Sequence, residues 1–159
     1  MPSRAIAPVV GVTILILITL GLSGTFAIVL AERSPGDEPP MFSLSIEVDP
    51  EDAGGEIVFI HEGGTTVDVE EFELWVEIDG QPLAIQPQVP MSQAEGFYKF
   101  PNGPFNEGSA DHSWSAGEQA SIKIAASTNE PNIRPGSEVT VHIYQDDVLI
   151  AEASTVASG

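Results

Sequence analysis

An uninterrupted apolar segment near the start of the chain constrains the fold more than any other feature. From Ile6 to Ala31 the chain contains 26 residues without Asp, Glu, Lys or Arg. As an α-helix this segment would be about 39 Å long, and the hydrocarbon core of a bilayer is roughly 30 Å thick. The sequence therefore predicts a helix that is long enough to span a membrane, followed by a separate domain.

Three kinds of targeting segment share this general pattern. A secretory signal peptide has a shorter apolar core, of about 7–15 residues, and ends at a small-residue cleavage site, for which Ala27 or Ala31 would serve. An uncleaved membrane anchor requires only the apolar length. In the third kind, the class III signal of prepilins, a basic and a small residue come before the apolar run, as Arg4 and Ala5 do here.

The residues at this junction carry a specific resemblance. The segment Arg4–Val12 reads RAIAPVVGV, and it resembles the start of haloarchaeal type IV pilins and pilin-like proteins. The similarity is strong over residues 4–30 and continues more weakly in residues 61–64, in residues 114–117 and in the C-terminal strands. Val10 stands where bacterial pilins have a glutamate that archaeal relatives commonly lack, so the assembly contact of that glutamate does not carry over.

The resemblance implies specific roles for residues at the start of the chain. A prepilin peptidase would cut between Ala5 and Ile6, which makes Arg4, Ala5 and Ile6 the processing residues. The helix would remain on the mature protein and mediate assembly. Residues suited to that helix are Pro8, Gly11, Gly21 and Gly24. Proline is tolerated in a first helical turn, and glycines let helices approach closely, although glycine is also generally frequent in membrane helices.

The charges predict the orientation of the chain and exclude one class of partner. Arg4 and the amino terminus precede the apolar segment, which favours an N-terminus inside and a C-terminus outside. Beyond residue 33 the chain has three basic and 23 acidic residues, a balance of −20. Such a charge repels phosphates, so we expect no nucleic-acid partner. A surface hydrated and screened in concentrated salt is the favoured explanation, with an acidic recognition face as the alternative.

The sequence divides the chain into four predicted regions. We expect a class III signal peptide at 1–5, a transmembrane and pilin-type helix at 6–31, a proline-rich linker at 32–40 and an acidic extracellular domain at 41–159. The chain has no cysteine, so this domain has no disulfide and must depend on a hydrophobic core. Its 119 residues are enough for one such core.

Alternating apolar residues predict that the domain is an all-β, immunoglobulin-like antiparallel β-sandwich. Asp79-Gly80 and Asp146-Asp147 mark expected hairpin turns, and Pro82 predicts an edge or irregular strand after the first of them. The expected strands cover residues 42–49, 57–60, 72–78, 81–85, 97–100, 121–124, 139–144 and 148–151. No long helical periodicity follows Ala31.

Few residues of the domain suggest chemistry. His61, His112 and His142 lack metal-ligand spacing, and we expect His61 to belong to a turn. The carboxylates of Asp49–Asp52 could suit calcium, but a solvated turn is the favoured interpretation. Asp111-His112-Ser113 has the composition of a catalytic triad, yet adjacent loop residues do not build that geometry. We therefore expect no enzyme, no metal and no cofactor, and we expect Trp114 to pack at the end of the sandwich.

These observations favour a type IV pilin-like surface subunit over a membrane-tethered binding protein that never polymerises. The subunit would be a single-pass membrane protein with an extracellular C-terminal domain, and it would assemble through its helix into an adhesive filament. The resemblance implies as partners the prepilin peptidase, other pilin subunits, a pilus assembly ATPase, its membrane platform and the membrane.

Overall fold

Antiparallel strands make up almost all of the regular structure in residues 41–50 and 54–159, the part of the chain that the computed structural model describes. Two short 3-10 turns, η1 (Val69–Glu71) and η2 (Gly103–Phe105), interrupt them. The described residues therefore confirm the predicted all-β class. The expected signal peptide, helix and linker (residues 1–40) lie outside the described residues.

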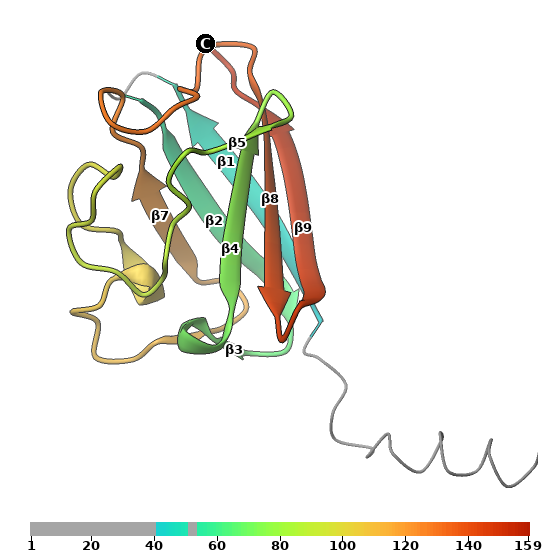
Figure 1. Cartoon of the computed structure of the whole chain (residues 1–159). Coiled ribbons are helices and arrows are strands. Elements are labelled where there is room, and N and C mark those ends of the chain that lie inside the picture. Colours follow the sequence, from blue (N-terminus) through green and yellow to red (C-terminus); the bar gives the residue numbers. More distant parts are fainter. Residues whose placement is uncertain (1–40, 51–53) are drawn as a thin grey trace, which may run out of the picture. The chain divides into compact units, whose positions relative to one another are not determined.

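Two larger sheets and one small ribbon contain the strands (Figure 1). The first sheet has the order β1-β2-β7 and contains β1 (Phe42–Asp49), β2 (Glu56–Gly64) and β7 (Gln119–Lys123). The second sheet has the order β5-β4-β8-β9 and contains β4 (Glu73–Ile78), β5 (Gln81–Pro82), β8 (Glu138–Gln145) and β9 (Val148–Val156). The ribbon pairs β3 (Val67–Asp68) with β6 (Ser113–Trp114). All the strand pairs are antiparallel.

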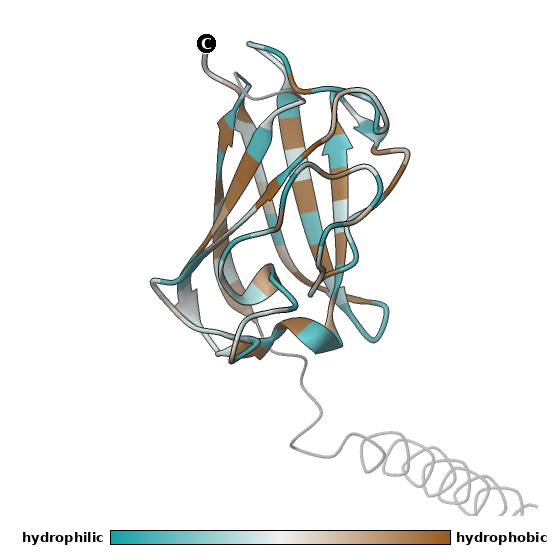
Figure 2. Cartoon of the chain, turned by 90° about the vertical axis from the view of Figure 1, so that its left-hand side faces the viewer, coloured by the Kyte–Doolittle hydropathy of each residue, from teal (hydrophilic) through white to brown (hydrophobic). Residues whose placement is uncertain are grey.

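The core lies between the two larger sheets, which face each other in a sandwich-like arrangement. Apolar and polar residues alternate along the strands, as the brown and teal bands of Figure 2 show. One face of each strand is therefore buried. Fully buried side chains of strands β2, β4, β7 and β8 are Ile57, Phe59, Val76, Ile78, Ile122, Val139, Val141 and Ile143.

An aromatic cluster fills one end of this core. Trp114 is fully buried, and its ring centroid lies 5.2 Å from Phe105 and 5.5 Å from Phe42. Its indole Nε1 donates to the carbonyl of Glu118 at 3.1 Å, which satisfies the polar atom. The prediction that Trp114 packs at the end of the sandwich is confirmed, because its buried ring belongs to this cluster.

Both predicted hairpin turns are present. Asp79 and Gly80 have φ angles of 52° and 74°, and Asp146 and Asp147 have φ angles of 50° and 62°. Two consecutive positive φ values define the turn whose twist matches a hairpin. The Asp79 carboxylate also accepts hydrogen bonds from the Glu138 backbone N–H and the Ser137 hydroxyl, at 2.9 and 3.0 Å, and so connects the first turn to the start of β8.

Of the predicted strands, 81–85 is reduced to two residues and 97–100 is absent. The strand after Gly80 ends at Pro82 on the sheet edge, as expected from the missing proline N–H. Residues 97–100 form no strand. Phe97 and Asn102 instead make single bridges to Ile124 and Ser121, because Lys99 between them has a φ of 67° and turns the chain away from the ladder.

Candidate functional site

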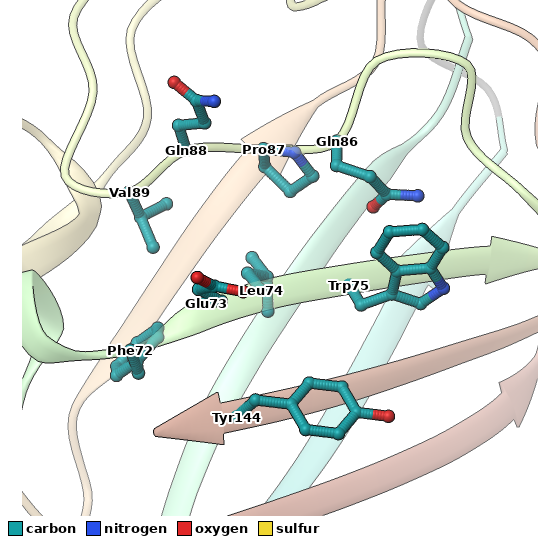
Figure 3. Close-up of a pocket in the computed structure, with 9 residues that line it drawn as sticks. All are labelled: Phe72, Glu73, Leu74, Trp75, Gln86, Pro87, Gln88, Val89 and Tyr144. Carbon is teal, nitrogen blue, oxygen red and sulfur yellow. The ribbon is translucent and has the colours of Figure 1, made fainter. Parts of the chain in front are cut away.

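A groove lies beside β4 in the described part of the chain (Figure 3). It has a volume of about 400 Å³. Its lining residues are Phe72, Glu73, Leu74, Trp75, Gln86, Pro87, Gln88, Val89 and Tyr144. Strand β4 therefore forms the floor, the segment 86–89 forms one wall, and Tyr144 of β8 extends the floor across the sheet.

Strand alternation places the aromatic side chains of this groove. Glu73, Trp75 and Glu77 point away from the core because Leu74, Val76 and Ile78 between them are buried. In the register of β4 and β8, Glu73 faces Tyr144 and Trp75 faces His142. These side chains consequently share the outer face of the second sheet, where Figure 3 shows Trp75 and Tyr144 on the same side of the ribbons.

A second hollow continues the groove across this face. It has a volume of about 340 Å³ and is lined by Glu73, Trp75, Glu77, His142, Tyr144 and Asp147. Three of these residues also line the first hollow. The two hollows together form one surface, which we call the acidic aromatic groove.

The wall of the groove is held by two amide side chains, those of the half-buried Gln86 and the buried Asn129. The Gln86 amide accepts from the Val76 N–H at 2.8 Å and donates to the Val76 carbonyl at 3.0 Å, so it pairs with the edge of β4 as a strand would. Asn129 is fully buried. Its amide accepts from the Ile85 N–H and donates to the carbonyls of Ile85 and Gly96, at 2.9, 2.9 and 3.2 Å. These five bonds fix the segment between β5 and β7 against the sheet.

The groove combines accessible rings with negative charge. Trp75 is 41% exposed, and its indole N–H donates to Glu77 at 3.2 Å, which orients the ring. The His142 and Tyr144 rings lie 6.2 Å apart with an interplanar angle of 30°. Nδ1 of His142 lies 3.2 Å from a Glu152 carboxylate oxygen. No lysine or arginine lines either hollow. Such a surface suits a cation, which is attracted both to ring faces and to carboxylates.

The prediction that His61 belongs to a turn is wrong. His61 lies within β2, which continues to Gly64, and it is fully buried. Its ring stacks on Phe42 with centroids 4.7 Å apart, and its Nε2 lies 3.0 Å from the Thr65 carbonyl oxygen. A register shift between Ser43 and Leu44 in the paired strand β1 lets the strand continue past His61. The residue is part of the aromatic cluster.

The Asp111-His112-Ser113 segment does not form a catalytic relay. The Asp111 carboxylate accepts from the Ser113 backbone N–H at 2.8 Å, and hydrogen bonds from Ser113 lower the pKa of Asp111. His112 instead contacts Glu70, with Nδ1 and the carboxylate oxygen 2.8 Å apart. This contact raises the pKa of His112 above its ordinary value. The geometry agrees with the expectation that adjacent residues would not build a triad.

The remaining predicted site residues fall into two groups. In the acidic loop that follows Asp49, residues 51–53 lie outside the described residues. Gly55 accepts a hydrogen bond from the Ile124 N–H at 2.9 Å and has a φ of 102°, so the end of this loop serves packing. The processing residues Arg4, Ala5 and Ile6 and the helix residues Pro8, Gly11, Gly21 and Gly24 also lie outside the described part of the chain.

Within residues 41–50 and 54–159, no three His, Asp or Glu side chains are grouped to hold a metal ion, and no helix has the length and apolar character to cross a bilayer. No known family profile matches the chain, and no curated protein matches it.

Proposed function

We propose that this chain is a type IV pilin-like surface subunit with an outward-facing, immunoglobulin-like β-sandwich. The observation that carries the proposal is the order of segments in the sequence. The basic and small residues Arg4 and Ala5 precede 26 uncharged residues, and a β domain with its own core begins directly after a short proline-rich linker.

In this proposal the apolar segment has two successive roles. It first anchors the subunit in the membrane and then packs with copies of itself to form the core of a filament. The acidic domains decorate the outside and provide the adhesive surface. The start of β1 and the C-terminus lie at opposite ends of the β domain (Figure 1). The loops at the C-terminal end are therefore away from the start of β1. The expected partners are the prepilin peptidase, other pilin subunits, the assembly ATPase and its membrane platform.

The processing site provides the direct test. We predict that the mature protein begins at Ile6, because class III cleavage removes only the residues before the apolar run. Mass spectrometry of membrane-extracted protein would read this terminus directly, and replacement of Arg4 and Ala5 should leave the precursor uncut. A mature terminus at Ile28 or Glu32 would instead mean that an ordinary signal peptidase removes the apolar segment, and the pilin-like proposal would fail.

The acidic aromatic groove supports a second candidate. A tethered extracellular protein that captures a solute or a surface group would also present ring faces and carboxylates on a rigid sheet. The two candidates differ in the state of the protein on cells. Sheared surface material that contains the protein in a filament fraction favours the subunit, whereas a purely monomeric membrane population favours the tethered binding protein.

A further inference from the structure

The described residues contain three exposed aromatic side chains, and they belong to two surfaces of opposite character. Trp75 lies in the acidic aromatic groove, and Tyr98 and Phe100, which are 51% and 59% exposed, flank Lys99. Large exposed aromatic side chains are the type of residue that dominates protein–protein contacts. We call the second surface, Tyr98-Lys99-Phe100, the lysine knob.

The segment that carries the lysine knob is bonded to the edge strand β7 of the first sheet. The Tyr98 N–H donates to the Lys123 carbonyl at 2.8 Å, and the Asn102 N–H donates to the Ser121 carbonyl at 3.1 Å. Both acceptors belong to β7. Lys99, which follows the first attachment, has a φ of 67°, and the three knob residues are all exposed. The Lys99 ammonium lies 5.2 Å from the centre of the Tyr98 ring, so a cation and two rings are presented together.

Charge distinguishes the lysine knob from the rest of the domain. The described residues contain three basic side chains against a large acidic excess. Lys123 pairs with Glu56 at 3.1 Å, which leaves Lys99 and Arg134 as the exposed cations. Within residues 41–50 and 54–159, the structure pairs Lys99 with the ring of Tyr98 and with no carboxylate.

We propose that the lysine knob of one copy docks in the acidic aromatic groove of the next copy. Lys99 meets Glu73 and Glu77 beside the face of Trp75, while Tyr98 and Phe100 cover the rings of Trp75 and Tyr144. The groove has rings and carboxylates but no cation, and the knob has rings and a cation but no carboxylate, so the two surfaces are complementary in both respects.

The arrangement of the two surfaces defines the kind of assembly. The knob belongs to the edge of the first sheet and the groove to the outer face of the second. A contact between two different patches is heterologous, so each copy can bind one neighbour through its knob and another through its groove. Such contacts form a ring where the rotation between copies closes and a helical filament where it does not, and the filament is the form that the proposed function requires. This inference rests on the proposed function, and it adds a domain contact to the helix contacts.

The absence of cysteine from the chain allows a direct cross-linking test in cells that produce the full chain. Thr140→Cys places a thiol on the groove face beside Glu77, and Glu95→Cys places one before the knob. With a short bis-maleimide, the double variant should give a ladder of dimers, trimers and longer products. Two single variants produced together should give dimers only, and each single variant alone should stay monomeric. Single variants that cross-link as well as the double variant would overturn the heterologous contact.

Charge reversal then tests the docking residues in the double-cysteine background. Lys99→Glu should reduce the ladder at least tenfold, and the additional pair Glu73→Lys and Glu77→Lys should restore it. Arg134→Glu is the matched control, because it reverses the other exposed cation, and it should leave the ladder unchanged. A ladder that survives Lys99→Glu, or one that Arg134→Glu reduces equally, would overturn the proposal. Melting curves of each variant separate a loss of docking from a loss of folding.

Filaments in the sheared fraction are scored separately. Filaments without a ladder would reject the knob-and-groove contact and leave the pilin-like function intact. A ladder without filaments would support the contact and reject the filament function. Absence of both, with the protein present at the cell surface, would reject both proposals.

Discussion

Removal of the Asn129 amide should loosen the wall of the acidic aromatic groove and destabilise the whole domain. Asn129→Ala deletes three hydrogen bonds, of 2.9, 2.9 and 3.2 Å, to the backbones of Ile85 and Gly96. Each intramolecular bond contributes about 0.5–1.5 kcal/mol net, and a buried group left unpaired costs about 1–3 kcal/mol. We therefore expect the free energy of unfolding to fall by about 3 kcal/mol, which corresponds to a melting temperature lower by roughly 10 °C.

Asn132→Ala provides the matched control on the same loop, because Asn132 donates a single bond of 3.3 Å to the Ala126 carbonyl. It should cost less than about 1 kcal/mol. Denaturant unfolding of a fragment with residues 41–159 in molar salt measures both values, since this range contains the hydrophobic core that the described residues form. Hydrogen exchange should also accelerate at residues 84–96 in Asn129→Ala only. Equal losses in the two variants, or unchanged exchange at 84–96, would refute the assigned role of Asn129.

Three further predictions concern salt, pH and assembly. The domain fragment should unfold or lose cooperativity near 0.01 M salt, where the Debye length is about 30 Å, and regain its fold near 1 M, where it is about 3 Å; a melting temperature independent of salt would contradict this. Contact with Glu70 raises the pKa of His112 in the folded state above the ordinary value of 6.5. Protonated His112 therefore stabilises the folded domain below pH 6.5, and this contribution is lost as the pH rises through the raised pKa. The difference in melting temperature between wild type and His112→Gln should accordingly be largest near about pH 5.5 and vanish in alkaline buffer. Bulky replacements at Gly11, Gly21 or Gly24 should retain the protein in the membrane but abolish filaments, as judged from sheared surface fractions.

The strands were predictable wherever a simple alternation continued without interruption. Residues 42–49 form β1 with the expected bounds, and β8 lies within one residue of the expected range. The two hairpin turns were also predictable, because Asp-Gly and Asp-Asp tolerate the positive φ values that such turns require. These features depend on neighbouring residues alone, so a single sequence contains the required information.

The long segment between β5 and β7 was not predictable in the same way. Its conformation depends on Gln86 and Asn129, whose amides bond to backbone groups ten and 44 residues away in sequence. No local pattern distinguishes an amide that bonds to a distant backbone in this way from a polar loop residue. His61 was misassigned for a related reason, because the glycines that follow it suggested a turn, whereas the structure continues β2 through them.

The acidic aromatic groove required knowledge of which strands are neighbours. Trp75 was recognisable as an outward residue of an alternating strand, but its relation to Tyr144 follows only from the pairing of β4 with β8. The lysine knob likewise depends on the attachment of residues 98 and 102 to β7. Sequence reasoning could mark exposed aromatic residues on strands, and that signal alone would have identified Trp75.

The acidic surface and the proposed contact between copies have compatible physical requirements. Two domains that each carry a large negative charge repel one another over long distances in dilute buffer, and concentrated salt removes that repulsion beyond a few ångströms. The interactions that remain in concentrated salt act at short range. They are cation–π contacts and the burial of aromatic surface. Lys99 with Tyr98 and Phe100, opposite Trp75 and Tyr144, provides these contributions. The same salt that permits the domain to fold would therefore also permit adjacent domains to dock.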